Sequence, residues 1–312
     1  MKYLVKKIIT LIGTLLLVSF IAFFLFQIVP GDPVTSILGT EYTPERAEAM
    51  REELGLDKPA IERYAVWLMD FVRGDFGTSY TYKIPVEELI GAKIPVTVYL
   101  AILTFVIIVI VSVPLAVIMA RFGKKKYSKG FDIFNQSVMA IPSFFLGIVI
   151  IIVFGLKMKV FIPGAYVDYR EDFAGFIRYI IPAAITVAIP KIAMMVKFMK
   201  KSLMNEMDSD YVRTAYSKGA SDNRVLFCHV LRNGLMPAIT MLGMIVAEIM
   251  AGSIVVEQVF NLPGLSAILV HSVSTRDYPV VQAIVVYIAF IVIITNCIVD
   301  ILYYIVDPRV RG

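Results

Sequence analysis

The side chains able to do covalent chemistry are few and scattered. Ser253 follows Gly252 near the end of a long apolar run, and His271 lies further along the chain. A serine hydroxyl and a histidine are the nucleophile and base of a hydrolase. A second glycine, which a nucleophile elbow needs, is missing here, and we expect His271 in a loop beyond the apolar run. An intramembrane serine protease is therefore not the favoured interpretation.

The chain also lacks the residue patterns that usually bind phosphate or metal ions. The chain has no G-x-x-x-x-G-K-[ST] phosphate loop, because Gly123-Lys124 is followed by Lys125 and offers no hydroxyl for magnesium. No Cys/His cluster surrounds His229 or His271. We therefore expect no catalytic residue, no bound metal and no cofactor in this chain, and no ATP hydrolysis by it.

A polar, basic stretch, Ser209–Pro237, stands between long apolar runs. Ser209 or Asp210 can cap a helix that begins at Tyr211. Gly219 suits a left-handed C-terminal cap for that helix. Because a helix of about eight residues is too short to be stable alone in water, we expect it to pack against a neighbour.

Two interpretations of this stretch stay open on physical grounds. Tyr211, Ala215 and the small pair Gly219-Ala220 form a compact surface that can enter a groove in a partner protein. The alternative is an ordinary basic connector between membrane helices. After Ser221, a second helix can place an apolar face against the membrane helices. That face comprises Val225, Leu226, His229 and Val230.

Composition indicates that lipid is the solvent for most of the chain. Hydrophobic residues make up 58%, charged residues 18%, and the mean hydropathy is +0.78. A helix needs about 20 mostly apolar residues to cross the hydrocarbon core, and its backbone must be satisfied within the span. The segments that qualify are Ile8–Val29, Val96–Ala120, Val138–Phe154, Tyr179–Phe198, Leu235–Val256 and Val280–Val306. We predict six transmembrane helices.

Basic residues follow the positive-inside rule. They occur before the first span, between the second and third, between the fourth and fifth, and after the last. This pattern places both termini in the cytoplasm. The net charge of +5 is thus explained by topology, and we expect no nucleic-acid partner.

The boundaries follow from these spans. Residues 1–30 form a tail and first span, 31–95 an extracytoplasmic helical insertion, and 96–312 a core with five spans and a cytoplasmic loop at about 200–234. Within the insertion, Thr43 and Pro44 favour a helix start, which should end near Leu54-Gly55. Pro59 should start a second helix that carries Tyr64, Trp67, Leu68 and Phe71, and Leu265 to Ser272 should form a short helix.

Polar residues inside apolar spans are costly and are expected to face protein or water. Glu248 lies deep in the fifth span, where it either lines a pathway or is a protonated group bonded to a neighbouring helix. Asn135 and Gln136 should make hydrogen bonds between helices. Pro142 and Pro190, among other span prolines, should kink helices or mark their starts.

The polar stretch resembles the EAA loop of ABC-importer permeases, in the form found in the dipeptide/oligopeptide/nickel permease family. Arg213 and Arg232 stand where the general pattern has Glu and Pro, and the peptide-permease branch resembles this chain at both positions. The matching loop residues are Asp210-Tyr-Val-Arg-Thr-Ala215, Lys218-Gly219-Ala220, Arg232-Asn233 and Pro237. Further matching motifs are Pro30-Gly-Asp-Pro33, Leu54-Gly-Leu-Asp57, Pro59, Arg73-Gly-Asp-Phe-Gly77, Ile94-Pro-Val-Thr97, Ile141-Pro-Ser-Phe144, Glu257, Phe260, Pro263-Gly-Leu265 and Arg276-Asp-Tyr-Pro279.

The resemblance implies a type I importer permease fold in the bacterial cytoplasmic (inner) membrane. It implies a second, related permease subunit, two cytosolic ATPases that bind ATP and magnesium, and an extracytoplasmic solute-binding protein. The imported solute would most naturally be a di- or oligopeptide, with glutathione, nickel chelates and sugars left open. A proton-coupled secondary transporter is the alternative.

The resemblance also assigns residues to roles. Separately from the resemblance, the charge of Glu248 within an apolar span makes it a candidate pathway or interior polar residue. Candidates for an extracytoplasmic gate or binding-protein contact are Glu257, Pro263, Gly264, Arg276 and Asp277. Candidates for coupling to the ATPases are Asp210, Tyr211, Arg213, Thr214, Ala215, Lys218, Gly219 and Ala220.

Overall fold

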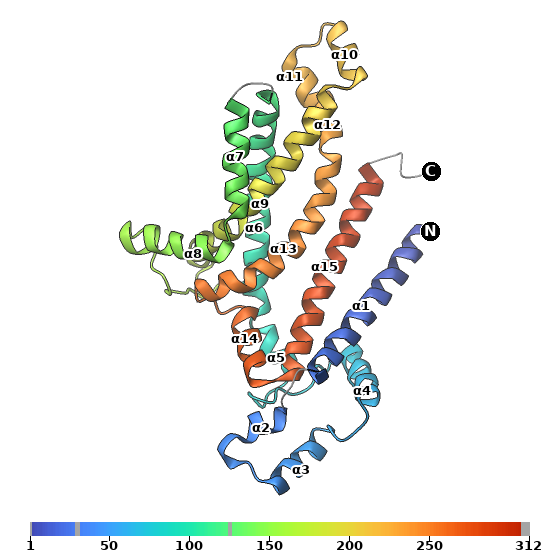
Figure 1. Cartoon of the computed structure of the whole chain (residues 1–312), viewed down its shortest axis with the longest axis vertical. Helices are drawn as coiled ribbons and strands as arrows, with labels where there is room; N and C mark the ends of the chain where they lie inside the picture. Colours follow the sequence, from blue (N-terminus) through green and yellow to red (C-terminus); the bar gives the residue numbers. More distant parts are fainter. Residues whose placement is uncertain (1, 29–31, 124–126, 307–312) are drawn as a thin grey trace. The chain divides into compact units, whose positions relative to one another are not determined.

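The computed structural model describes residues 2–28, 32–123 and 127–306 (Figure 1). Across these ranges the chain forms helices and loops, without an extended strand. The helices that are long and apolar enough to cross a membrane are Lys7–Leu25, Val86–Arg121, Phe173–Met207, Thr240–Val259 and Tyr278–Ile301. The bent pair Ser128–Ala140 and Ser143–Lys157 adds a further crossing if it is one span. The prediction of an all-α polytopic membrane protein is confirmed.

The chain divides into two compact units. Unit 1 comprises residues 1–97 and 263–294, and unit 2 comprises residues 98–262 and 295–312. Helices α6 (Ile94–Arg121) and α15 (Tyr278–Val306) each contribute to both. The other elements of unit 1 are α1 (Lys2–Ile28), α2 (Pro33–Leu38), the 3₁₀ turn η1 (Gly39–Glu41), α3 (Pro44–Glu53), α4 (Ala60–Arg73), α5 (Val86–Gly91) and α14 (Leu265–Thr275).

The helices between α1 and α6 start and stop where their local signals predict. The Thr43 hydroxyl caps α3 by accepting a hydrogen bond from the Arg46 amide at 3.3 Å, with Pro44 in the first helical position. α4 begins after Pro59 and ends at Gly74, whose φ of +90° only glycine adopts without strain. α14 likewise confirms the predicted short helix after the Pro-Gly turn.

Within unit 1, α4 packs on α1 through aromatic side chains. The hydroxyls of Ser19 and Tyr64 lie 2.9 Å apart, and the Tyr64 ring meets Phe23 edge-on. Trp67 and Phe71 continue the row of rings along α4. A separate apolar core joins α5, α14 and the first half of α15, and it comprises Val86, Ile90, Leu265, Ile268, Val280, Ala283 and Ile284.

A buried carboxylate ties two distant segments of unit 1 together. Asp277 is fully buried and accepts hydrogen bonds from the Ser79 hydroxyl, the Tyr80 amide at 3.0 Å and the Thr81 amide at 3.1 Å. Its own amide donates to the Ser272 carbonyl at 2.8 Å, which closes the turn after α14. Burial, followed by the negative charge of Asp277, raises the pKa of the Tyr80 hydroxyl to about 12, so Tyr80 stays neutral at physiological pH.

The central element of unit 2 is one long helix, α9 (Phe173–Met207). It packs against α7, α8 and α13. Its interior prolines, Pro182 and Pro190, leave it a single continuous helix. The remaining elements of unit 2 are α7 (Tyr127–Ala140), α8 (Ser143–Ile150), the π-helix η2 (Ile151–Lys157), α10 (Asp210–Ser217), α11 (Asp222–Arg224), the π-helix η3 (Val225–Val230), α12 (Leu231–Gly234) and α13 (Met236–Val259).

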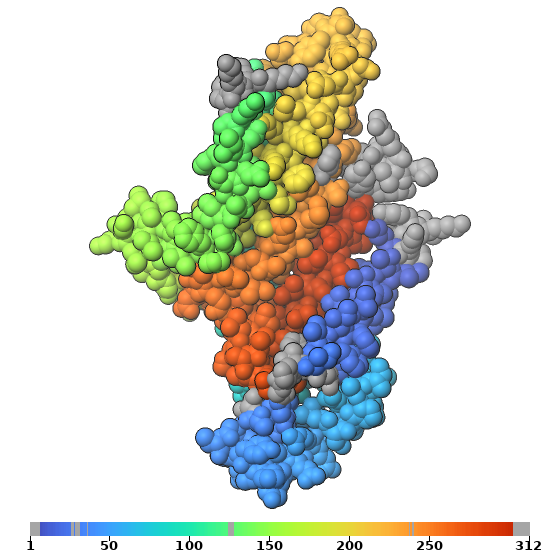
Figure 2. Space-filling model, in the orientation of Figure 1, coloured from blue at the N-terminus to red at the C-terminus, as the bar shows by residue number. Residues whose placement is uncertain are grey.

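The third predicted span, Val138–Phe154, is not a single helix, although the prediction that Pro142 kinks a helix or marks a helix start is confirmed. The chain bends by 93° between α7 and α8, at Ile141-Pro142. Pro142 has no amide hydrogen for helix pairing and disfavours a helical residue before it, so it ends α7 and starts α8. α8 and η2, in yellow-green, consequently project from the rest of unit 2 (Figure 2).

Candidate functional site

The polar loop between α9 and α13 folds into consecutive short helices at one end of unit 2 (Figure 1). α10 begins at Asp210, one residue before the predicted start, with Ser209 extended in the cap position. Gly219 adopts a φ of +81°, so the predicted left-handed cap is confirmed. The Gly219 and Ala220 amides close the turn by donating to the carbonyls of Tyr216 at 2.9 Å and Ala215 at 3.2 Å.

One side of α10 is anchored inside unit 2. Val212 is 2% exposed and lines a small cavity of about 230 Å³ together with Ala120, Met204 and Tyr216. The Tyr211 hydroxyl donates a hydrogen bond to Glu206 Oε2 at 2.6 Å. Burial, followed by this bond, raises the pKa of the Tyr211 hydroxyl above its ordinary value. These contacts supply the neighbour that such a short helix needs.

The opposite side of α10 is open. The side chains of Asp210 and Arg213 are 98% and 76% exposed, and Thr214 and Lys218 are exposed as well. Ala215 and Ala220 are half-buried. No atom lies within 4 Å of the position that a Cβ of Gly219 would occupy. The loop thus presents small and polar residues outward from an anchored helix.

The second part of the loop packs tightly against α9. Val225, Leu226 and Val230 are buried, as predicted, but His229 is exposed. The prediction for His229 was wrong because this turn is a π-helix, whose i→i+5 pairing sets Val230 rather than His229 above Val225.

Gly234 closes the loop onto α9. The Ser202 hydroxyl donates to the Gly234 carbonyl at 2.9 Å, and a Cβ on Gly234 would lie 2.6 Å from Leu203 Cδ2. Leu203 is fully buried. Only a glycine permits this close approach, which joins the loop firmly to the long helix.

Two polar groups within the spans form an ion pair between α9 and α13. Lys191 Nζ binds Glu248 Oε2, with side chains 23% and 40% exposed. Glu248 therefore faces a cation on a neighbouring helix. The sequence reasoning missed Lys191, although a lysine directly after Pro190 in an apolar span is a usable signal.

A second polar cluster links α7 to the end of α9 that precedes α10. Lys200 lies buried in α9 and donates to Ser128 Oγ at 2.7 Å and Asp132 Oδ1 at 2.6 Å. Asn135 Nδ2 donates to the Ala193 carbonyl at 2.7 Å, and Lys197 Nζ donates to Gln136 Oε1 at 3.0 Å. The predicted interhelical hydrogen bonds of Asn135 and Gln136 are confirmed.

Removing one partner of the membrane ion pair should destabilise the protein. Glu248→Leu leaves the Lys191 charge unpaired between apolar helices, at a cost on the order of 2–3 kcal/mol. The double variant Lys191→Leu/Glu248→Leu should recover most of this loss because no charge is stranded. Thermal unfolding of the three proteins in lipid nanodiscs measures the difference. A Glu248→Leu protein as stable as the double variant would contradict the pairing.

The proposed gate and receptor-contact residues do not share one exposed surface. Glu257, expected in a loop, lies in the last turns of α13 and is fully buried, as is Asp277. Gly264 is also buried, whereas Pro263 and Arg276 are half-buried. Arg276 has a φ of +60° and ends α14. Among the described residues no group of three or more His, Cys, Asp or Glu is placed to hold a metal ion.

Comparison with known proteins agrees with this architecture. Residues 112–312 match the family model described as binding-protein-dependent transport system inner membrane component, and residues 1–101 match the N-terminal model of the same transport systems. The oligopeptide transport system permease protein AppB of Bacillus subtilis is 35% identical over 312 residues, with 99% of each chain covered. The glutathione transport system permease protein GsiC of Escherichia coli K12 is 34% identical over 311 residues, covering 100% of this chain and 99% of GsiC.

The family models together span nearly the whole chain, and the relatives align from end to end. The spans, the α7–α8 pair and the loop after α9 all lie within the residues that these relatives match. The chain belongs to the binding-protein-dependent permeases, the multi-pass inner-membrane components of ABC importers of the dipeptide/oligopeptide family.

Proposed function

We propose that this permease imports peptides and that a cytosolic ATPase binds it at α10 and Gly219. A second permease subunit would complete the pathway, two ATPases would bind ATP and magnesium, and a solute-binding protein would deliver the peptide. Both termini and the α9–α13 loop then lie in the cytoplasm, as the basic residues favour. ATP hydrolysis takes place in the partner subunits.

The observation that carries this proposal is the two-sidedness of α10. Val212 is buried in unit 2, whereas Arg213, Thr214 and Lys218 point away from it. A helix that is anchored on one side and open on the other can bind a partner without detaching from its own subunit. The loop's charge alone would not distinguish this arrangement from a simple connector.

Force applied to α10 has a continuous route into the membrane. The loop is joined to α9 by the Ser202–Gly234 hydrogen bond and the Gly234–Leu203 contact. α9 then runs unbroken to Phe173 and carries Lys191, the partner of Glu248 on α13. ATP-driven approach of the two ATPases would shift the balance between two packed arrangements of these helices.

The proposal of a peptide substrate is supported by the names of the relatives. AppB is named for oligopeptides and GsiC for glutathione, itself a peptide. Both align over the full length of this chain, including the spans that would form the pathway. An amide-containing solute is thus better supported than a sugar or a metal chelate.

Gly219→Val is expected to uncouple ATP hydrolysis from uptake. In the subunit itself a Cβ at this position meets no atom within 4 Å, so the main internal cost is the left-handed backbone, about 1–2 kcal/mol. A branched side chain would, however, enlarge the surface that enters the ATPase groove. We expect the assembled importer to reach the membrane, with peptide uptake per ATP hydrolysed reduced severalfold in proteoliposomes.

Gly74→Val is the matched control. Gly74 also has a left-handed φ, of +90°, and also has no atom within 4 Å of its Cβ position, but it lies in the outer insertion. It should impose the same backbone strain and leave uptake per ATP unchanged. Equal effects of the two variants would count against docking at α10. Uptake by the chain alone under a proton gradient would overturn the whole proposal.

A further inference from the structure

The ion pair between α9 and α13 lies near the middle of two membrane spans. Lys191 stands centrally in α9, and Glu248 stands centrally in Thr240–Val259, the apolar part of α13. Both helices belong to unit 2 and pack on each other, and Lys191 Nζ donates to Glu248 Oε2. Because a charged side chain is costly next to lipid, this pair needs polar surroundings.

The pair is packed on one side and open on the other. The side chains of Lys191 and Glu248 are 23% and 40% exposed. Among the described residues the two groups bond only to each other, so two ammonium hydrogens and one carboxylate oxygen remain for a further partner. A polar molecule from outside the chain can therefore reach both charges.

Glu248 stands in a row of open positions along α13. The other members of the row, all exposed, are Thr240, Met244, Ala251, Val255 and Gln258. Spacings of three and four residues place the row on one helical face, whereas Ile245 and Ile249 between them are buried. A carboxylate, a hydroxyl and an amide on this face suit a water-filled passage better than lipid.

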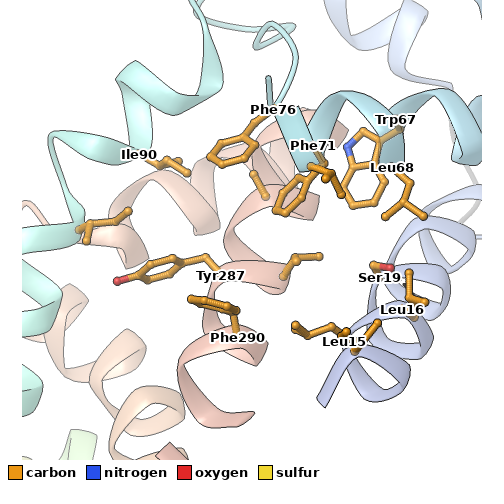
Figure 3. Close-up of a pocket in the computed structure, with 15 residues that line it drawn as sticks. Leu15, Leu16, Ser19, Trp67, Leu68, Phe71, Phe76, Ile90, Tyr287 and Phe290 are labelled. Atoms are coloured by element: carbon orange, nitrogen blue, oxygen red, sulfur yellow. Dashed lines mark hydrogen bonds between the residues drawn. The ribbon is translucent and has the colours of Figure 1, made fainter. Parts of the chain in front are cut away.

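An apolar cavity in unit 1 offers a contrasting surface (Figure 3). Its volume is about 440 Å³, and Trp67, Phe71 and Phe290 are among the residues that line it. The lining residues carry no charge, and the Ser19 hydroxyl among them already donates to the Leu16 carbonyl at 2.9 Å. A peptide placed there would leave its charged ends and amide groups unsatisfied. The open face of α13 is the better match for a zwitterionic solute.

We propose that Lys191 and Glu248 line the translocation pathway and bind the charged ends of the peptide, an inference that rests on the proposed peptide import. A linear peptide with free ends carries an ammonium and a carboxylate whatever its sequence. Glu248 accepts hydrogen bonds from the ammonium, and Lys191 donates to the carboxylate. Without peptide the two side chains neutralise each other. Because this pairing must be given up for the peptide, binding stays weak enough for the solute to move on.

A cysteine on the open face reports peptide binding directly. Ala251 is exposed and lies one turn from Glu248. In a Cys228→Ser/Cys297→Ser background, Ala251→Cys should react with a charged methanethiosulfonate reagent when the importer is assembled with its second permease and ATPases in nanodiscs. Millimolar trialanine should slow this labelling at least twofold. N-acetyl-trialanine amide, which lacks both charged ends, should slow it by less than a fifth. The binding protein is left out, so its own preferences do not enter.

Two double variants separate peptide binding from helix packing. Lys191→Leu/Glu248→Leu removes both charges without stranding one, and the difference between the two peptides should disappear. Lys200→Leu/Asp132→Leu removes the ion pair between α7 and α9 in the same way and should keep the difference. Survival of the difference in the first variant would overturn the inference.

Two further cysteines control for access to the face. Ile249→Cys is the buried control, because Ile249 is 1% exposed, and it should stay unlabelled. Val255→Cys, at a position that is 46% exposed on the open face, is a second reporter should Ala251→Cys assemble poorly. Failure of both open-face cysteines to react would show that the second permease or lipid covers this face, and would overturn the inference.

The proposed function is tested separately, by trialanine uptake in proteoliposomes with ATP and the solute-binding protein. Uptake together with equal slowing of labelling by the two peptides would refute the site at Lys191 and Glu248 and leave peptide import standing. Absence of uptake by the unmodified importer would refute peptide import, and the inference with it.

Discussion

Asp277→Ala should cost unit 1 about 3 kcal/mol or more in stability, enough to abolish accumulation of the protein in the membrane. The fully buried carboxylate satisfies the Ser79 hydroxyl and the Tyr80 and Thr81 amides. Alanine leaves all three donors without an acceptor, and each buried unsatisfied group costs about 1–3 kcal/mol. Expression level and thermal unfolding in nanodiscs are the measurements.

Asp75→Ala provides the comparison. Asp75 Oδ1 accepts one hydrogen bond, from the Gly77 amide at 2.9 Å, but the residue is exposed and water can replace it. Its loss should cost less than about 1 kcal/mol. Asp277→Asn should fall between the two, because its amide group turns one acceptor into a donor that faces another donor. Equal melting temperatures for Asp277→Ala and Asp75→Ala would show that the buried network is dispensable.

Gly234→Leu is expected to displace the α9–α13 loop and abolish transport while the spans remain inserted. Even its Cβ would lie 2.6 Å from Leu203 Cδ2 and 3.4 Å from the Leu203 Cα. Because Leu203 is fully buried, it has little room to move, and overpacking of this kind costs about 1–3 kcal/mol. We expect limited proteolysis to cut the loop faster, and peptide-stimulated ATP hydrolysis by the assembled importer to be lost.

Gly130→Leu is the control, because it makes the same substitution at a position with no neighbouring side chain. Gly130 lies on α7 and has no atom within 4 Å of its Cβ position, and leucine is the better helix former. This variant should be at least as stable as the unmodified protein and should transport normally. A Gly234→Leu protein with ordinary proteolysis and coupled transport would mean that the loop does not need its contact with α9.

Local signals predicted the parts of the fold that depend on neighbouring residues. Thr43 and Pro44 specified the start of α3, and Gly219 specified the end of α10, because caps and left-handed turns are decided within a few residues. The bend at Pro142 carried the same kind of signal. A helix break at Pro142 was predicted, but a bend as large as 93° was not, because the apolar run continues past it and satisfies the length rule for a span.

Interhelical hydrogen bonding by Asn135 and Gln136 was predicted, but the partners of the charged residues in the spans were not. The Lys191–Glu248 pair and the buried Lys200–Asp132 pair depend on which sides of α7, α9 and α13 meet. The exposure of His229 depends on a π-turn that helical periodicity does not anticipate. The need for a glycine at position 234 becomes evident only when the structure shows Leu203 opposite it.

The length of α9 has a consequence for how an importer of this kind is assembled. Its 35 residues span about 52 Å at 1.5 Å per residue, whereas the hydrocarbon core is about 30 Å thick. The excess of about 22 Å, some four turns, lies beyond the hydrocarbon core, and polar residues such as Lys200, Lys201 and Glu206 place part of it on the side where α10 follows. A motor that engages α10 therefore meets it beyond the hydrocarbon core and needs no surface that lies among acyl chains.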